Sequence, residues 1–352
     1  METGKPVEGK NITIYDIARE AGVSAATVSR VLTSNANVRP EKKERILKLI
    51  EKYHFKPNAM ARGLSDTRSK IIGIIAADVR NPFYSQVFVA CEQAARKRGY
   101  TVLLCNSLGE REQEMNQLEM LHEQRVDAVI QLGGRVDDLV SDVEYVEHVN
   151  KLLNTVPMVV TGKLEGTQCY QVRIDAMKAM DLLMEHLISL GHERIALIGG
   201  RRNVLSTYEK MQRYKQILMK NQIPFREELV APDGAYDDVG AYKQMNGMLE
   251  KGIVPTAVIA INDFSAAGIL RSITEHGYRV PQDISLVSYD NTYITELLMP
   301  KLTSVDYDYE GFGEMLVESA VSAVEGRDVQ LLRMVEPTLI VRESSGKVRS
   351  DK

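Results

Sequence analysis

Residues 13–32 read T-I-Y-D-I-A-R-E-A-G-V-S-A-A-T-V-S-R-V-L, and this stretch decides the fold of the N-terminal part of the chain. Thr13 and Asp16 have the spacing of a capping box, in which each side chain bonds the backbone N–H of the other residue. Apolar residues follow at the i, i+3, i+4 and i+7 spacing of a helix over residues 13–21: Ile14, Ile17, Ala18 and Ala21. Gly22 ends this helix, and Ser24 can cap a second one. Two short helices joined by a tight glycine turn predict a helix-turn-helix.

A third helix is expected to begin at Pro40, because a proline at the first helical position loses no hydrogen bond. Four of its residues can face a shared core: Ile46, Leu49, Ile50 and Tyr53. The helix follows Arg39 where a serine or threonine cap would be usual, which predicts a looser first turn. We therefore expect a small three-helix domain over residues 1–56, with an ordered core over about 12–56.

The exposed face of the second helix carries small or hydroxyl side chains and one arginine: Ala25, Ala26, Thr27, Ser29 and Arg30. Such a face allows close approach to a DNA groove, and an arginine can make two hydrogen bonds to a guanine edge. A solvated surface helix would more often carry Glu and Lys. The alternative is a structural three-helix cap, in which the same residues only cap and pack.

The formal net charge of −4 conceals a segregation of charge along the chain. Residues 1–70 hold 14 Lys and Arg against 8 Asp and Glu, whereas the remainder holds 30 against 40, so the two parts carry +6 and −10. A basic segment on an acidic body suggests a module that binds a polyanion. The chain has no apolar run of membrane-spanning length and no apolar leader, so we expect a cytoplasmic protein without a membrane partner.

The 13–32 stretch, followed by F-K-P-N-A-M-A-R-G-L at 55–64, resembles the lactose-repressor/galactose-repressor family of bacterial transcription regulators. The resemblance continues in N-P-F-Y at 81–84, L-G-H-E-R-I-A-L-I-G-G at 190–200, I-N-D at 261–263, S-L-V-S-Y-D-N-T at 285–292 and P-K-L-T-S-V at 300–305. It covers about residues 11–342. It implies a DNA-binding regulator, most often a repressor, whose operator affinity is controlled by a small-molecule effector, a sugar or sugar derivative.

The same resemblance assigns the DNA contacts. Ala25, Ala26 and Arg30 become the major-groove readers, and a further set lies near phosphates: Tyr15, Ser24, Thr27, Ser29 and Asn58. Residues 57–68 become a hinge helix and linker, with Ala61 at the DNA and Leu64 wedged between base pairs in the minor groove. A helix of about two turns with an internal glycine is unstable alone in water, so a flexible linker is the alternative for the free protein.

From residue 71 short apolar runs alternate with amphipathic helices, as in buried parallel sheets covered by helices. The expected strands are 71–76, 102–105, 128–132, 158–161, 195–198, 257–261 and 286–289, and the expected helices are 83–98, 111–124, 176–190, 206–221 and 264–276. So many units exceed one open sheet, which predicts an α/β body of two doubly wound lobes facing a cleft, similar to periplasmic binding proteins. We expect the body over 69–342, with one lobe from 69–162 plus 302–328, the other from 163–300 plus 329–342, and a polar tail over 343–352.

Ligands in such sheets lie beyond the carboxyl ends of the strands. Lys163, Asn262 and Asp290 come directly after expected strands, where a cap or turn role is the alternative for each. The resemblance implies a larger effector site: Phe83, Tyr84, Lys163, Ser206, Lys210, Tyr236, Asn262, Asp290 and Tyr309. Aromatic rings in this set could pack against a ring face of the ligand.

Three positions depart from the family pattern. Lys210 stands where many relatives have an arginine, and Arg213 replaces a small glycine. The segment 161–163 reads Thr-Gly-Lys where an Asp-Arg pair is common, which removes a carboxylate often available to sugar hydroxyls. A lysine is a point charge that lacks the two-pronged geometry of arginine. The ligand is therefore expected to differ from simple sugars or to carry negative charge.

Catalytic chemistry is not expected. His192 follows Gly191, an expected helix C-cap, which favours a structural role. The chain has no phosphate-loop, dinucleotide, zinc-protease or nucleophile-elbow motif, and its three cysteines are widely spaced, so no cofactor or metal is expected. A solute-binding protein and a carbohydrate-active enzyme with the same body are the alternatives. A homodimer on a pseudo-palindromic operator is expected, because one helix-turn-helix reads one half-site and the tail lacks leucine heptads for a tetramer.

Overall fold

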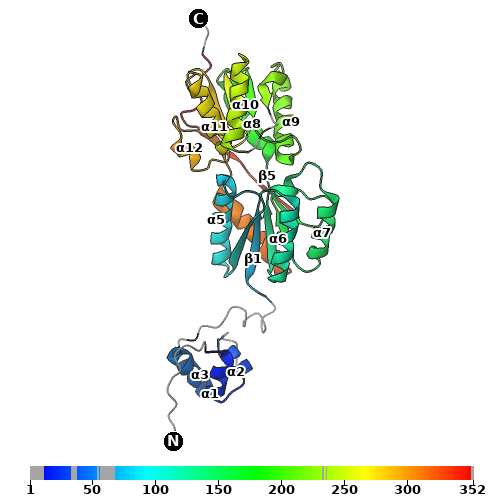
Figure 1. The fold of residues 1–352 in the computed structure, drawn as a ribbon, viewed down its shortest axis with the longest axis vertical. Coiled ribbons are helices and arrows are strands. Elements are labelled where there is room, and N and C mark those ends of the chain that lie inside the picture. The colour runs from blue at the N-terminus through cyan, green and yellow to red at the C-terminus, as the bar shows by residue number, and fades with distance from the viewer. Residues whose placement is uncertain are drawn as a thin grey trace. The chain divides into compact units, whose positions relative to one another are not determined.

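The computed structural model of the chain describes residues 12–32, 38–53, 55, 68–231, 234 and 236–349. The chain divides into two compact units, Met1–Ser69 and Lys70–Lys352, and Figure 1 shows each as a separate fold. The expected hinge contacts Asn58, Ala61 and Leu64 lie outside the described residues. No helix in the described ranges is long and apolar enough to cross a membrane.

The first unit contains the three expected helices, α1 (Ile14–Ala21), α2 (Ala25–Leu32) and α3 (Pro40–Lys52). Thr13 and Asp16 form the capping box at the start of α1, and Gly22 ends the helix with a positive φ of 66°, which glycine adopts without steric cost. Arg39 makes no side-chain cap to α3, as expected. The buried side chains in the described part of this unit are all apolar: Ile17, Ala18, Ala21, Val28, Val31 and Ile46.

The second unit is built on two six-stranded sheets. The first has the order β11-β5-β4-β3-β1-β2 and is parallel throughout. Its strands are β1 (Ile71–Ala76), β2 (Thr101–Asn106), β3 (Ala128–Leu132), β4 (Met158–Val160), β5 (Tyr170–Ile174) and β11 (Leu332–Val335). The order places β1 and β3, the strands with the most buried apolar residues, in the interior of the sheet.

The second sheet has the order β12-β10-β9-β8-β6-β7, and only the β10–β12 pair is antiparallel. Its strands are β6 (Ile195–Ile198), β7 (Val230–Ala231), β8 (Ala257–Ala260), β9 (Ser285–Tyr289), β10 (Thr303–Asp306) and β12 (Thr338–Ile340). Each sheet with its helices forms one lobe of the unit, here called the first and second lobe.

Helices cover both faces of each sheet, which buries the strands on two sides. In the first lobe α5 (Pro82–Lys97) and α13 (Tyr309–Val324) pack on one face, and α6 (Arg111–Glu123) and α7 (Val143–Leu153) pack on the other. In the second lobe α8 (Ala176–Ser189) and α9 (Leu205–Lys220) lie opposite α10 (Asp238–Glu250) and α11 (Asp263–Glu275). A short α12 (Ile294–Leu297) follows β9. The two-lobed, doubly wound α/β body is confirmed.

The expected lobe boundaries are wrong at three strands. β5 belongs to the first sheet although 163–300 was expected in the second lobe, and β11 also pairs there, on β5. β10 belongs to the second sheet, on β9, although 302–328 was expected in the first lobe. The chain therefore crosses between lobes after β5, after β10 and after β11. Short strands with mixed polar residues at these crossings carry too weak an apolar pattern to be assigned from sequence.

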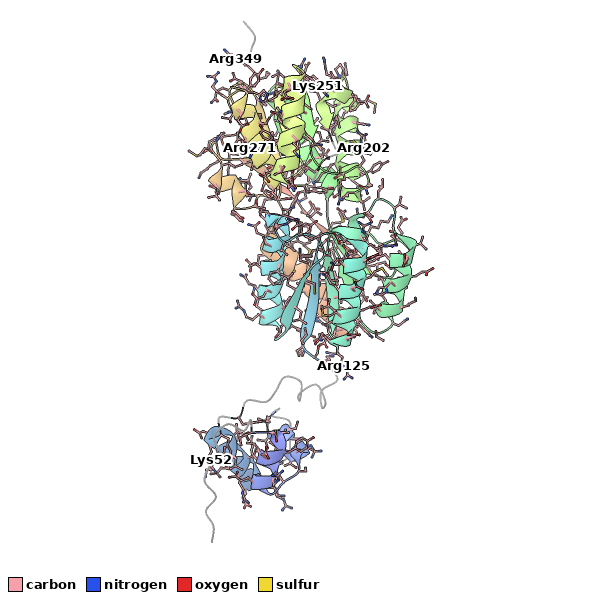
Figure 2. All side chains as sticks on the ribbon, viewed as in Figure 1. Lys52, Arg125, Arg202, Lys251, Arg271 and Arg349 are labelled. Atoms are coloured by element: carbon pink, nitrogen blue, oxygen red, sulfur yellow. The ribbon has the colours of Figure 1, made fainter. Side chains whose placement is uncertain are left out.

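Most of the expected polar tail, residues 343–349, packs on the second lobe. Ser344 is buried, and its hydroxyl accepts from the Thr303 N–H at 2.8 Å. The Val348 N–H donates to Leu190 O at 3.0 Å, and His192 Nε2 lies 2.9 Å from Gly346 O. His192 thus holds the tail, and burial lowers its pKa. Figure 2 places Arg349 and Lys251 at the end of this lobe that is remote from the first.

Candidate functional site

The first candidate surface is the exposed face of α2. Tyr15 is 68% exposed, Ser24, Ala26 and Arg30 are exposed, and Ala25, Thr27 and Ser29 are half-buried. The Ser24 hydroxyl accepts from the Thr27 N–H at 3.3 Å and lies 2.9 Å from the Thr27 hydroxyl. The expected cap on α2 is therefore present. A capped helix N-terminus with two hydroxyls presents N–H dipoles and donors suited to a phosphate oxygen.

The second candidate site is a cavity of about 820 Å³ between the two lobes of the second unit. It lies where the carboxyl ends of strands from both sheets meet: Ala77 and Gly133 follow β1 and β3, and Asn262 and Asp290 follow β8 and β9. This is the edge of a doubly wound sheet at which ligands bind. Figure 2 shows Arg125 at the opposite end of the first lobe, away from the second lobe.

Seven of the nine expected effector residues line this cavity: Phe83, Tyr84, Ser206, Lys210, Tyr236, Asn262 and Asp290. Lys163 does not line it, because its ammonium pairs with Glu165 on the outer surface. Tyr309 also lies outside the lining. Its hydroxyl donates to the Asp290 carbonyl oxygen at 2.7 Å, so it supports the loop that carries Asp290.

Asp290 and Lys210 are the buried charges of the cavity, with exposed fractions of 8% and 9%. Within the described residues the Asp290 carboxylate accepts no hydrogen bond and the Lys210 ammonium forms no ion pair. The ammonium lies 3.9 Å from the centroid of the Tyr289 ring. Burial, followed by the charge of Asp263, raises the pKa of Asp290 to about 8, and burial lowers the pKa of Lys210. Asp290 also has a φ of 99°, a conformation that costs energy for a residue with a side chain.

Aromatic rings form the apolar part of the cavity. Phe83 packs edge-on against Tyr84, with ring centroids 5.1 Å apart, and against Tyr307 at 6.2 Å. The Tyr236 hydroxyl lies 2.7 Å from the Thr207 hydroxyl. A Cβ at Gly133 would lie 2.4 Å from the Tyr84 hydroxyl, so only glycine allows this ring to occupy its position. The rings therefore offer flat faces of the kind on which sugar or base rings stack.

Asn262 has a structural task in addition to its place in the lining. Its Oδ1 accepts from the Ser265 N–H at 2.7 Å and caps α11, and its Nδ2 donates to the Tyr236 carbonyl oxygen at 3.0 Å. The neighbouring Asp263 is fully buried and accepts from Ser288, Thr292 and Ser304. These bonds hold the ends of β8, β9 and β10 together. The cap role that the sequence left open for Asn262 is thus present, and the bond from Nδ2 holds the backbone of Tyr236.

The cavity also has lining residues that the sequence did not predict, and they include Arg135, Asp137, Arg173 and Glu209. Arg173 and Glu209 form an ion pair between the lobes at 2.7 Å, and Ser206 Oγ donates to Asp137 Oδ2 at 2.7 Å, again between the lobes. Asp137 lies five residues beyond β3, so the rule for strand ends could have found it. Arg173 lies on β5, whose sequence gave no strand signal. No cluster of metal-ligating side chains occurs among the described residues.

Comparisons with known proteins agree with this architecture. Residues 13–58 match the family described as Bacterial regulatory proteins, lacI family, and residues 184–345 match a Periplasmic binding protein-like domain. Catabolite control protein A of Priestia megaterium is 33% identical over 297 residues, which cover 84% of this chain and 87% of that protein. The Catabolite control protein A match spans both units of this chain, so the two units occur together in a known protein.

Two solved structures have the same fold. The Lac repressor dimer bound to operator and the anti-inducer ONPF superposes with a TM-score of 0.85 at 28% identity, covering 96% of this chain and all of that one. The complex of the transcriptional regulator CelR with cellobiose gives 0.69 at 26% identity, covering 95% of this chain and all of that one. With a helix-turn-helix unit, a two-lobed body and a relative at this identity over most of its length, the chain belongs to the lacI family of bacterial regulatory proteins.

Proposed function

We propose that this regulator is a repressor that binds a pseudo-palindromic operator as a homodimer. Its affinity for the operator falls or rises when a small molecule fills the cavity between its lobes. The observation that carries the proposal is a pair of ionisable groups, Asp290 and Lys210, that are mostly buried in a cavity lined by aromatic rings and form no hydrogen bond or ion pair with another described residue. Ionisable groups without hydrogen-bond partners are costly to bury, so a cavity that keeps them is suited to a polar ligand that supplies the missing bonds.

The chemistry of the lining favours a hydroxyl-rich effector, a sugar or sugar derivative. The Asp290 carboxyl group can form hydrogen bonds with hydroxyls, the Lys210 ammonium can donate to ring or hydroxyl oxygens, and Phe83 offers a flat apolar face. The relative CelR is bound to cellobiose, a disaccharide with these groups. Asp137 and Glu209 next to Lys210 balance its charge, which argues against a strongly anionic effector at this end of the cavity.

The DNA-binding part of the proposal rests on α2. Arg30 is the base-reading arginine, Ala25 and Ala26 allow close approach, and Tyr15, Ser24, Thr27 and Ser29 contact phosphates. Asn58, Ala61 and Leu64 complete the contacts as a hinge segment that folds on DNA and wedges Leu64 into the minor groove. The Lac repressor structure holds operator DNA as a dimer, and the same arrangement here would place two copies of α2 on two half-sites.

Exposed apolar side chains support the dimer. One group lies on α5 and on and after the edge strand β2 of the first lobe, and another lies on α12 of the second lobe and just before and after it. The residues are Val89, Leu104, Leu108, Tyr293, Leu297 and Met299. Figure 1 shows α5 and α12 on the same side of the two lobes. An apolar surface shared by both lobes would transmit a change in the angle between them to the partner.

A mobility-shift assay with genomic fragments at physiological salt tests the DNA function, and a thermal-shift screen of sugars, sugar derivatives and nucleobases identifies the effector. Selected fragments are expected to be retained. Retention of none, together with tight binding of a sugar, would instead assign a solute-binding protein. Sedimentation of a stable monomer or tetramer would contradict the dimer.

With the effector in hand, Asp290→Ala tests the two-site arrangement. The variant is expected to lose the effector response completely while its operator affinity without effector stays within a few-fold of the wild type, because DNA and effector bind in different units. The measurement is operator binding titrated with and without the screened compound. Loss of basal operator binding in a folded variant would reduce Asp290 to a structural residue.

A further inference from the structure

The segment 161–163 reads Thr-Gly-Lys and lacks the Asp-Arg pair that is common at this place in the family. The turn Gly134–Asp137 lies directly on Gly162. A Cβ at Gly162 would lie 1.9 Å from the Val136 carbonyl oxygen, and the Lys163 N–H donates to that same oxygen at 2.6 Å. A side chain at position 162 would therefore displace the turn. Glycine at this position admits a loop that a larger residue would exclude.

The consequence is the position of Asp137, the last residue of that turn. Its side chain reaches the other lobe, where Ser206 Oγ donates to Oδ2 at 2.7 Å and where the Ser206 backbone also favours the ionised carboxylate. Ser206 is the second residue of α9, and the N-cap residue of α9 is Val204, which has no side-chain acceptor. The Asp137 carboxylate of the opposite lobe therefore lies at the N-terminus of α9, which has no capping side chain of its own.

The surroundings of Asp137 suit a carboxylate that serves the cavity. Asp137 lines the cavity, and Lys210, one turn further along α9, is the cation that favours its ionised form. Two further contacts join the lobes beside it: the Leu139 N–H donates to Asn203 O at 2.8 Å, and Asp138 pairs with Val204 as an isolated bridge. Burial raises the pKa of Asp137 to about 6, while the Ser206 bonds and Lys210 oppose the rise.

We propose that Asp137 is the carboxylate that replaces the one lost at 161–163, and that it latches the two lobes by capping α9 from the opposite lobe. Closure of the cavity is then coupled to the stability of the first turn of α9, because opening the lobes removes the cap. The inference rests on the proposed effector cavity as the place where the latch acts. The contact between Asp137 and Ser206 forms without a ligand, so it can be tested on the ligand-free chain.

Hydrogen–deuterium exchange on the ligand-free full chain tests this latch at residues 205–208. In Asp137→Ala the amides of this first turn are expected to exchange at least about fivefold faster than in the wild type, since a lost N-cap acceptor has an effect of this size. Asp137→Asn should keep most of the protection, because the amide oxygen still accepts from Ser206. Peptides from α10 and α11 should not change in either variant.

Gly162→Ala tests the loop separately. It adds one methyl group and removes no polar atom, yet it is expected to reproduce the Asp137→Ala exchange at 205–208 because it displaces the turn. Gly247→Ala is the matched control, since Gly247 lies in α10 with nothing within 4 Å of an added Cβ. Glu144→Gln, on the exposed start of α7, controls for the loss of one negative charge in the first lobe.

Unchanged exchange at 205–208 in Asp137→Ala would overturn the latch, and so would faster exchange spread evenly over the whole second lobe. An unchanged Gly162→Ala variant would overturn the role of the glycine. Because all these measurements are made without a ligand, failure to find an effector in the thermal-shift screen would count against the proposed function alone.

Discussion

The helix-turn-helix unit and the two-lobed body handle charge in opposite ways. In the described part of the first unit every buried side chain is apolar, and the ion pair between Lys52 and Glu20 joins α3 to α1 at the surface. In the body, Asp290, Lys210, Asp263 and Glu114 are buried. On a surface that binds a polyanion the charged side chains are exposed to solvent, whereas in a cavity that binds a small molecule they are buried. The first unit should therefore respond to salt and the second to pH.

Ile46→Ala is expected to have the largest effect of the substitutions that test this comparison, because Ile46 is fully buried among the three helices. The lost packing is expected to cost about 2–5 kcal/mol, which exceeds the stability that so small a domain can spare. Operator binding should disappear while the melting transition of the body stays unchanged, as followed by calorimetry and mobility shift. The control is Leu47→Ala, at an exposed position next in the chain. A shift of the body transition would contradict independent units.

Asp290→Asn tests the pH response of the body. The pKa of Asp290 is raised in the folded chain to about 8, so between about pH 4 and 8 the folded state holds a proton that the unfolded state releases. The free energy of unfolding from this group therefore falls as pH rises and reaches its lowest value above pH 8. Asn has no such proton. The variant should be about 1–3 kcal/mol more stable than the wild type at pH 8, with a smaller difference at pH 5.

Urea denaturation of the body at the two pH values measures this difference. An equal gain at pH 5 and pH 8 would show that the substitution relieves backbone strain at the φ of 99° and not the buried charge. Asparagine tolerates positive φ better than most residues, so the comparison of the two pH values is what separates the two causes.

Arg30→Ala tests the DNA face of the first unit. Loss of a two-pronged base contact should cost about 1–3 kcal/mol of operator affinity and relax the preference at one base pair in each half-site. Footprinting on a series of operators with single base changes measures both effects. Arg19→Ala on α1 serves as the control for loss of one positive charge. An unchanged footprint for Arg30→Ala would move base reading to other residues.

Glu20→Gln is expected to have the smallest effect, because the ion pair it breaks is exposed. Glu20 accepts from Lys52 at 2.8 Å and from the Tyr53 hydroxyl at 2.7 Å, and the bond from Lys52 lowers its pKa. The variant should lower the melting temperature of the first unit slightly at low salt, and the difference from wild type should vanish near 1 M salt. A difference that persists at high salt would mean that the contact acts by packing.

The helices of the first unit and most strands of the body were predictable because their signals are local. The capping box of Thr13 and Asp16, the glycine turn at Gly22 and the proline at position 40 each act within a few residues of the chain. The interior strands β1, β3 and β6 were predicted with their observed bounds, since strands buried on both faces form continuous apolar runs. The short strands β5, β10 and β11 have no such runs.

The sequence by itself determined the fold class, the family and seven of the residues that line the cavity, because strand ends and family motifs mark positions along one chain. Only the tertiary structure decided which lobe holds β5, β10 and β11, since pairing depends on neighbours distant in sequence. It also decided that Lys163 turns to Glu165 and that Asp137 reaches Ser206. The Asp137–Ser206 contact joins residues 69 positions apart across two lobes, and no local pattern of residues predicts a contact of that kind.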